Sequence, residues 1–177
     1  MDQKTIKNFT YVAAFCFSIM AIMNISSAIR YQNFMGWFYV IGYILVVIAL
    51  VTSVPALSTV GFAIHIIPVI LSLFQSDFSY LFYFCVLQGI LIILYNLTSL
   101  PVHPLLMLAS IKRTHAKTLC ISAAVLYIVS SLINMLRNII LVGSTGYTSI
   151  FSLISLLLVV VGEVCLGIAY EGTARRS

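Results

Sequence analysis

The chain has 177 residues, of which 62% are hydrophobic and only 7% are charged. An average soluble domain is about half apolar and about a quarter charged, and a small domain leaves much of its surface exposed to water. The composition therefore excludes a soluble globular fold and a disordered chain, and it indicates an integral membrane protein. The net charge of +5 does not indicate a nucleic-acid partner, because the basic residues lie between apolar segments and form no basic stripe.

Six apolar stretches are long enough, or nearly so, to cross a membrane as helices, which takes about 20 mostly apolar residues. The breaks between them contain turn-forming residues, as in Tyr31-Gln32-Asn33 and Gly143-Ser144-Thr145-Gly146. The sequence predicts an all-α integral membrane protein, a bundle of six transmembrane helices in one domain over residues 1–177. In chain order the stretches are 9–28, 36–52, 56–74, 78–97, 118–142 and 147–170.

The basic residues predict how the bundle is oriented. With six spans and a cytoplasmic N-terminus, seven basic residues face the cytoplasm and two, Arg30 and Arg137, face the other side. The positive-inside rule then places both termini in the cytoplasm, and we expect a multi-pass protein of a bacterial plasma membrane. The seven are Lys4, Lys7, Lys112, Arg113, Lys117, Arg175 and Arg176.

The first stretch has an alternative interpretation as a cleaved signal peptide. It ends in Ser26-Ser27-Ala28, a pattern of small residues like a signal-peptidase site. Cleavage there would leave five spans. The apolar run of about 19 residues exceeds the usual length of roughly 7–15 for a signal peptide, which favours retention.

The longest connection, residues 98–117, is predicted to be a cytoplasmic loop. Pro101 and Pro104 fix a bend in it, and the apolar part at 105–111 is too short to span a bilayer. That part is predicted to form an interfacial helix, with Lys112 and Arg113 facing lipid headgroups.

A weak internal repeat also appears in the sequence. Ala13-Ala14, Asn24 and Gly36 recur 110 residues later as Ala123-Ala124, Asn134 and Gly146. The pattern predicts a parallel repeat that relates the hairpin of spans 1 and 2 to that of spans 5 and 6.

Glu163 is the most informative polar residue, because no soluble-enzyme motif is present and chemistry must be sought inside the membrane. In a helix its face also carries Ser149, Ser152, Val159, Gly167 and Tyr170, so this face is predicted to point inward. A lone carboxyl in hydrocarbon tends to be protonated, and it could bind a proton or a cationic ligand. The alternative is a neutral carboxyl that is hydrogen-bonded to a neighbouring helix.

Other polar residues inside the spans are candidates for the same site. His65, three residues before Pro68, is predicted to lie at the depth of Glu163, about 10–14 Å from the cytoplasmic end. Either the two side chains lie side by side in a site, or His65 is a structural histidine whose hydrogen bonds are satisfied within the bundle. A second group predicts a polar vestibule open to the outside, or hydrogen bonds that join helices: Tyr127, Ser130, Asn134, Asn138 and Arg137 in the fifth span, with Gln88 in the fourth.

These features favour a transporter, or the membrane-embedded substrate-binding subunit of one, over an enzyme. The alternative is a non-catalytic accessory, assembly or immunity protein, and an intramembrane enzyme is favoured least. The expected partners are the lipid bilayer, other membrane subunits or a second copy of the chain, and a small molecule of undetermined class. No cofactor or metal site is expected, because the four cysteines and the loop histidines His103 and His115 form no ligand spacing.

Overall fold

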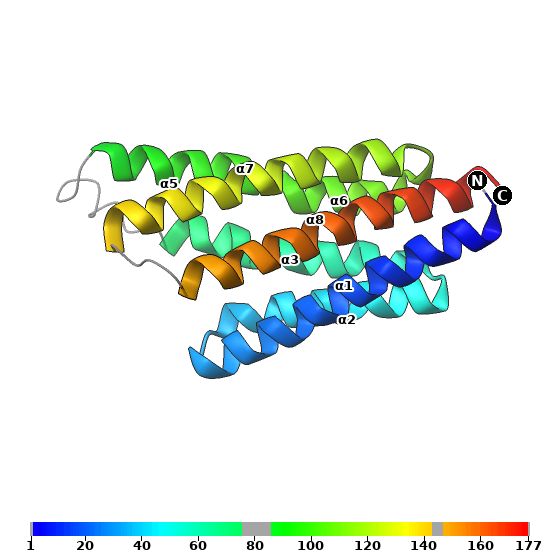
Figure 1. The fold of residues 1–177 in the computed structure, drawn as a ribbon, viewed down its shortest axis with the longest axis horizontal. Coiled ribbons are helices and arrows are strands. Elements are labelled where there is room, and N and C mark those ends of the chain that lie inside the picture. Colours follow the sequence, from blue (N-terminus) through cyan, green and yellow to red (C-terminus); the bar gives the residue numbers. More distant parts are fainter. Residues whose placement is uncertain (1, 76–85, 143–146, 177) are drawn as a thin grey trace.

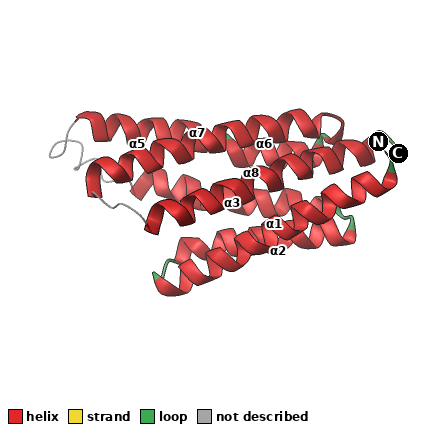
Figure 2. Ribbon diagram, viewed as in Figure 1, coloured by secondary structure: helices red, strands yellow, loops and turns green. Residues whose placement is uncertain are grey.

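The computed structural model describes residues 2–75, 86–142 and 147–176, and the regular structure in these ranges is helical (Figures 1 and 2). A single 3₁₀ turn, η1 (Arg113–His115), joins two of the α-helices. The α-helices are α1 (Gln3–Arg30), α2 (Phe34–Thr52), α3 (Pro55–Gln75), α5 (Val86–Ser99), α6 (Val102–Ile111), α7 (Ala116–Val142) and α8 (Tyr147–Ala174).

Helix length and composition confirm a multi-pass membrane protein. Five helical stretches in the described ranges are long and apolar enough to cross a bilayer, and Pro55–Leu71 of α3 is a shorter apolar helix. Their outer faces carry large exposed apolar side chains, such as Val125, Val129, Leu132 and Leu136 along one side of α7. Such a stripe would be costly in water and suits contact with lipid. The five stretches are Gln3–Arg30, Phe34–Thr52, Ile90–Ile111, Arg113–Asn138 and Ser152–Ala174.

The helices form a ring of neighbours. Packing runs from α1 to α2, α3, α6, α7 and α8, and α8 packs against α1 again; α5 lies along α7. Both chain termini lie at the same end of the bundle (Figure 1), which we call the terminal end. The ring encloses an interior that each helix can line with one face, while its opposite face turns outward.

The segment predicted as a cytoplasmic loop differs most from expectation. Residues 102–111 form α6, which buries Val102, Leu106 and Ala109 and packs against α3 and α7 inside the bundle, not at its surface. α5 ends on the hydrogen bond from Leu100 N to Asn96 O, and α6 begins on that from Leu105 N to Pro101 O. Pro101 and Pro104 lack N–H donors, so they interrupt one long helical stretch, Ile90–Ile111, without ending it. The first part of the predicted span 78–97 lies outside the described residues.

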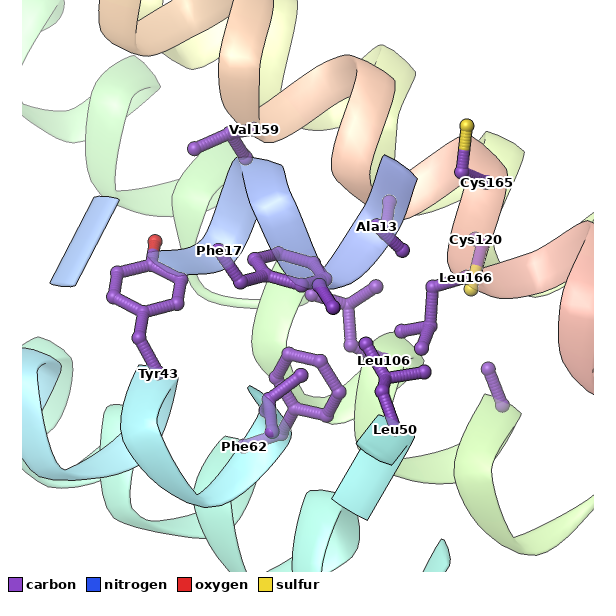
Figure 3. Packing of buried hydrophobic residues seen from close by; sticks show 14 of the residues in the cluster. Ala13, Phe17, Tyr43, Leu50, Phe62, Leu106, Cys120, Val159, Cys165 and Leu166 are labelled. Carbon is purple, nitrogen blue, oxygen red and sulfur yellow. The ribbon is translucent and has the colours of Figure 1, made fainter. Parts of the chain in front are cut away.

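The hydrophobic core fills the half of the ring near the terminal end and the middle. Phe17 of α1 lies at its centre, stacked on Tyr43 with ring centroids 5.8 Å apart and edge-on to Phe62 at 6.4 Å (Figure 3). α8 packs closely on its neighbours: a side chain at Gly167 would collide with Cys120, and one at Gly162 would fit only tightly against Phe17. Because α1 supplies one wall of this core, the packing depends on the first span being retained.

Hydrogen bonds between helices fasten the terminal end. The Ser58 and Tyr170 hydroxyls lie 2.6 Å apart and join α3 to α8, and those of Thr59 and Ser110 lie 2.7 Å apart and join α3 to α6. Lys117 N donates to a carboxylate oxygen of Glu171 at 3.2 Å, which caps the start of α7. This half of the ring is therefore closed by both apolar and polar contacts.

The candidate sequence repeat remains a prediction. Ala13-Ala14 in α1 and Ala123-Ala124 in α7 are all buried. α1 and α7 both pack against α8. Gly146, the second glycine of the pattern, lies outside the described residues.

Candidate functional site at mid-depth

Five side chains from five helices lie at one depth in the ring, and we call them the mid-depth layer. Each is eight to eleven residues from the terminal end of its helix, or about 12–17 Å at 1.5 Å per residue. The hydrocarbon core of a bilayer is about 30 Å thick, so this depth corresponds to its middle. The residues are Tyr43 of α2, His65 of α3, His103 of α6, Tyr127 of α7 and Glu163 of α8.

His65 is fully buried, and its contacts define its protonation pattern. Nε2 lies 3.1 Å from the carbonyl oxygen of Tyr39. A carbonyl only accepts hydrogen bonds, so Nε2 carries the hydrogen and Nδ1 of the neutral ring carries the lone pair. Nδ1 is buried and has no hydrogen-bond partner within the described part of the chain. His65 therefore presents an unpaired acceptor to the interior.

Close packing of α2 on α3 positions the His65 ring. A Cβ atom at Gly42 would lie 2.1 Å from His65 Nε2, and one at Gly61 would lie 2.6 Å from the Gly42 carbonyl oxygen. Only glycine leaves the space for the imidazole edge to rest on the α2 backbone. The Tyr43 ring covers another side of His65, with centroids 4.5 Å apart.

His103 joins His65 across the interface of α3 and α6. The two ring centroids are 5.0 Å apart with the planes at 68°, and the Tyr39 ring lies 6.1 Å from His103. Nδ1 of His103 is also buried and lacks a partner in the described ranges. This pair could not be predicted from the sequence, because the pattern around His103 indicates a cytoplasmic loop. The two prolines beside it were the available signal, since broken helices inside a membrane line binding sites.

Glu163 is 1% exposed, and one of its carboxyl oxygens, Oε2, is buried without a hydrogen-bond partner among the described residues. The carboxyl is close enough to interact electrostatically with Tyr43 of α2 and with Cys120 and Tyr127 of α7. A buried, incompletely paired carboxyl is costly, whether it is ionised or neutral. Glu163 thus places a second polar atom without a partner among the described residues in the layer, near α2 and α7.

Glu163 and His65 share a depth, and Tyr43 lies near both, but no hydrogen bond joins them directly in the described structure. The predicted inward stripe around Glu163 holds for Val159, Gly167 and Tyr170, which are buried. Ser152, on the same face but nearer the start of α8, is exposed. The side chain of Ser149 is not among the described ones.

Above the mid-depth layer, away from the termini, the interior becomes polar. Tyr127, Asn134 and Asn138 lie on the side of α7 opposite its lipid-facing stripe, and Ser130 and Arg137 lie at the edge of this side. Asn134, Arg137 and Asn138 are half-buried although they face inward, so the ring is less tightly filled here. Nε of Arg137 is buried without a partner among the described side chains, and its charge lies near Tyr95 of α5.

Asn24 of α1 and Gln88 of α5 are two further polar residues within the predicted spans. Asn24 of α1 donates from its side chain to the Met20 carbonyl of its own helix at 2.8 Å. Gln88 lies in the first turn of α5, and its side chain is outside the described set. Cys16, Cys120 and Cys165 are free and buried, and no group of three or more metal-ligating side chains occurs in the ranges that the structure describes.

The residue types of the mid-depth layer limit the chemistry that it offers. It offers one carboxyl, two imidazoles and several phenols at one depth, and in the described ranges no serine or cysteine is hydrogen-bonded to a histidine as an activated nucleophile would be. Comparisons with protein-family models, with curated proteins and with solved structures found no match for this chain.

Proposed function

We propose that this protein is a membrane transporter, or the membrane-embedded substrate-binding subunit of one, and that the mid-depth layer is its solute site. One observation carries the proposal: Glu163 and His65 each bury a polar atom that has no hydrogen-bond partner among the described residues, at the depth expected for the middle of a bilayer. An unsatisfied buried polar group costs about 1–3 kcal/mol, so it persists where function requires it. Ionisable residues inside membranes commonly mark solute or ion pathways.

The break between α5 and α6 supports the same assignment. It occurs at Leu100-Pro101, beside His103, and therefore at the depth of the site. Discontinuous helices at the membrane midplane supply backbone groups and helix ends to the solute and ion sites of many secondary transporters. A bundle that served only as an anchor would gain stability from a continuous helix.

The two halves of the ring differ in a way that suits access from one side. The terminal half is closed by the core and by the Ser58–Tyr170 and Thr59–Ser110 hydrogen bonds. The other half turns the half-buried Asn134 and Asn138 inward. With six spans and the termini in the cytoplasm, as the basic residues favour, a solute would reach the layer from outside.

Unpaired acceptors favour a ligand that donates hydrogen bonds or carries positive charge. Glu163 is proposed to bind a protonated solute or a coupling proton, with the Tyr43 and Tyr127 phenols beside it. An intramembrane enzyme is disfavoured by the residue types of the layer. Other membrane subunits or a second copy of the chain remain the proposed partners beside the bilayer.

A thermal-stability screen of the purified full-length protein tests this proposal. Solutes of different charge, at several pH values, are added to the wild type, to Glu163→Gln and to Glu171→Gln. Glu171 is the matched control, because its carboxylate caps α7 at the terminal end and lies outside the layer. We expect a cationic solute to raise the unfolding temperature of the wild type and of Glu171→Gln, and not that of Glu163→Gln. A solute effect that survives in Glu163→Gln would contradict the site. No solute effect at any pH would favour the non-catalytic accessory protein.

A further inference from the structure

We propose that His65 and His103 bind a first-row transition-metal ion through their Nδ1 atoms. The first support is the hydrogen bond of His65 to the Tyr39 carbonyl at 3.1 Å. Histidines that ligate metals usually donate their second ring N–H to a carbonyl or carboxylate, which fixes the tautomer and orients the ring. His65 has this arrangement, and its other nitrogen, fully buried, has no partner in the described part of the chain.

The spacing of the two imidazoles fits one shared ion. Metal–nitrogen bonds of about 2.0–2.1 Å place each ring centroid roughly 3 Å from the metal, and two ligands at a tetrahedral angle then have centroids about 5 Å apart. The observed separation is 5.0 Å. The two Nδ1 atoms do not satisfy each other by a hydrogen bond, since both lack partners within the residues that the structure describes.

Both rings are held by rigid backbone. His103 lies in the first turn of α6, between Pro101 and Pro104, whose fixed φ angles restrict the chain around it. His65 rests on Gly42, where no side chain intervenes. A site whose ligands are already oriented loses little conformational entropy when the ion binds.

The donor set selects the class of ion. Two neutral imidazoles suit Zn²⁺, Co²⁺, Ni²⁺ or copper, whereas Mg²⁺ and Ca²⁺ require oxygen ligands. The described residues supply two ligands here and not the four of a closed structural zinc site, so water or a solute completes the coordination. An ion held in this way exchanges readily, as a transported or regulatory ion must.

Binding of Co²⁺ to the full-length protein in detergent, with any affinity tag removed, tests the proposal. The visible absorption of Co²⁺ reports its ligands, and the variants are His65→Gln, His103→Gln and His115→Gln. His115 is the control, because it is exposed in η1. We expect one Co²⁺ per chain in the wild type and in His115→Gln, displaced by Zn²⁺ and not by Mg²⁺. Each of the other two variants should bind at least about tenfold more weakly, a loss seen even for outer-shell groups.

A spectrum that stays that of aqueous Co²⁺ would overturn the site, as would binding that survives both variants or is lost in His115→Gln. If the glutamine variants fail to fold, X-ray absorption of the zinc-loaded wild type decides: two imidazole ligands are expected, and oxygen ligands alone would refute the site. The inference shares His65 with the solute site proposed above, but the two can fail separately, since Glu163→Gln is expected to lose the solute effect and to bind Co²⁺ like the wild type.

Discussion

Individual atoms of the mid-depth layer set the strongest constraints on what the protein can do. The Nε2–carbonyl contact fixes the tautomer of His65. It leaves the lone pair on Nδ1, which is buried and has no hydrogen-bond partner among the described residues. The burial and the shared depth of Glu163 and His65 could be predicted from hydrophobic context and helix rise. The position of His103 could not be predicted, because Pro101 and Pro104 are typical of a loop and here lie at the start of a buried helix. A packing partner that lies 38 residues away along the chain leaves no signal in a single sequence.

Gly42→Ala should destabilise the protein more than Gly36→Ala does. The added Cβ would lie 2.1 Å from a ring atom of His65 in the first case and 3.0 Å from the Ala28 Cβ in the second. We expect a loss of about 1–3 kcal/mol for Gly42→Ala, typical of overpacking, together with weaker Co²⁺ binding. Chemical denaturation in mixed micelles measures the first effect. Equal losses for the two variants would show that the His65 ring is free to move away.

Glu163→Leu should leave the unfolding free energy unchanged or raise it. The carboxyl is buried with one oxygen that has no partner within the described part of the chain, so an apolar side chain of similar size removes the cost of burying that oxygen. Ser58→Ala, which deletes a buried hydroxyl that has a partner, should instead be destabilising. A large loss of stability in Glu163→Leu would show that Glu163 is structural and not retained for binding.

Among the elements, the broken helix α5–α6 is the one that the sequence pattern does not predict. The other spans follow from apolar length and turn residues, and their bounds agree with the predicted stretches to within a few residues, apart from helical extensions at the terminal end of α1 and α8. Apolar length does not predict α6, because its apolar run of seven residues is too short to span a membrane by itself. The run is the continuation of a helix that proline interrupts. Packing against α3 and α7 supplies the stability that local hydrogen bonding lacks there.

Replacing Pro101 and Pro104 together by alanine should weaken metal binding without unfolding the protein. The new N–H groups can bond to the Leu97 and Leu100 carbonyls, since an internal proline costs a helix about 3 kcal/mol. A continuous helix would turn His103 away from His65. Pro55→Ala is the control, because proline is tolerated at the first residue of a helix. Unchanged Co²⁺ affinity in the double variant would mean that the break does not position His103.

The α3–α8 hydrogen bond should be measurable as a coupling. In a double-mutant cycle of Ser58→Ala and Tyr170→Phe, we expect an interaction free energy of about 1 kcal/mol, since both side chains are buried. Arg175→Ala should change stability little, because its pair with Glu171 is largely exposed on the arginine side. A coupling near zero would remove this bond from the contacts that close the terminal half.

At the scale of the whole molecule, both termini lie at one end of the ring of helices, together with basic residues of η1. The positive-inside rule predicts that this end faces the cytoplasm. Cysteines at Thr114 in η1 and at Tyr31, beside the α1–α2 turn, lie at opposite ends of the bundle and are exposed. In a background without Cys16, Cys85, Cys120 and Cys165, an impermeant thiol reagent outside intact cells should label Tyr31→Cys and spare Thr114→Cys. The reverse pattern would invert the topology.

The most direct test of the central claim asks whether water-soluble molecules reach the mid-depth layer. In the same cysteine-free background, Glu163→Cys is compared with Val161→Cys, which lies at nearly the same depth on the lipid-facing side of α8. If the layer is a solute site, a small charged thiol reagent added from the side opposite the termini should modify Glu163→Cys and leave Val161→Cys unreacted. If Glu163→Cys stays unreacted from both sides while Tyr31→Cys is labelled completely, the layer is a closed structural core and the transport proposal is wrong.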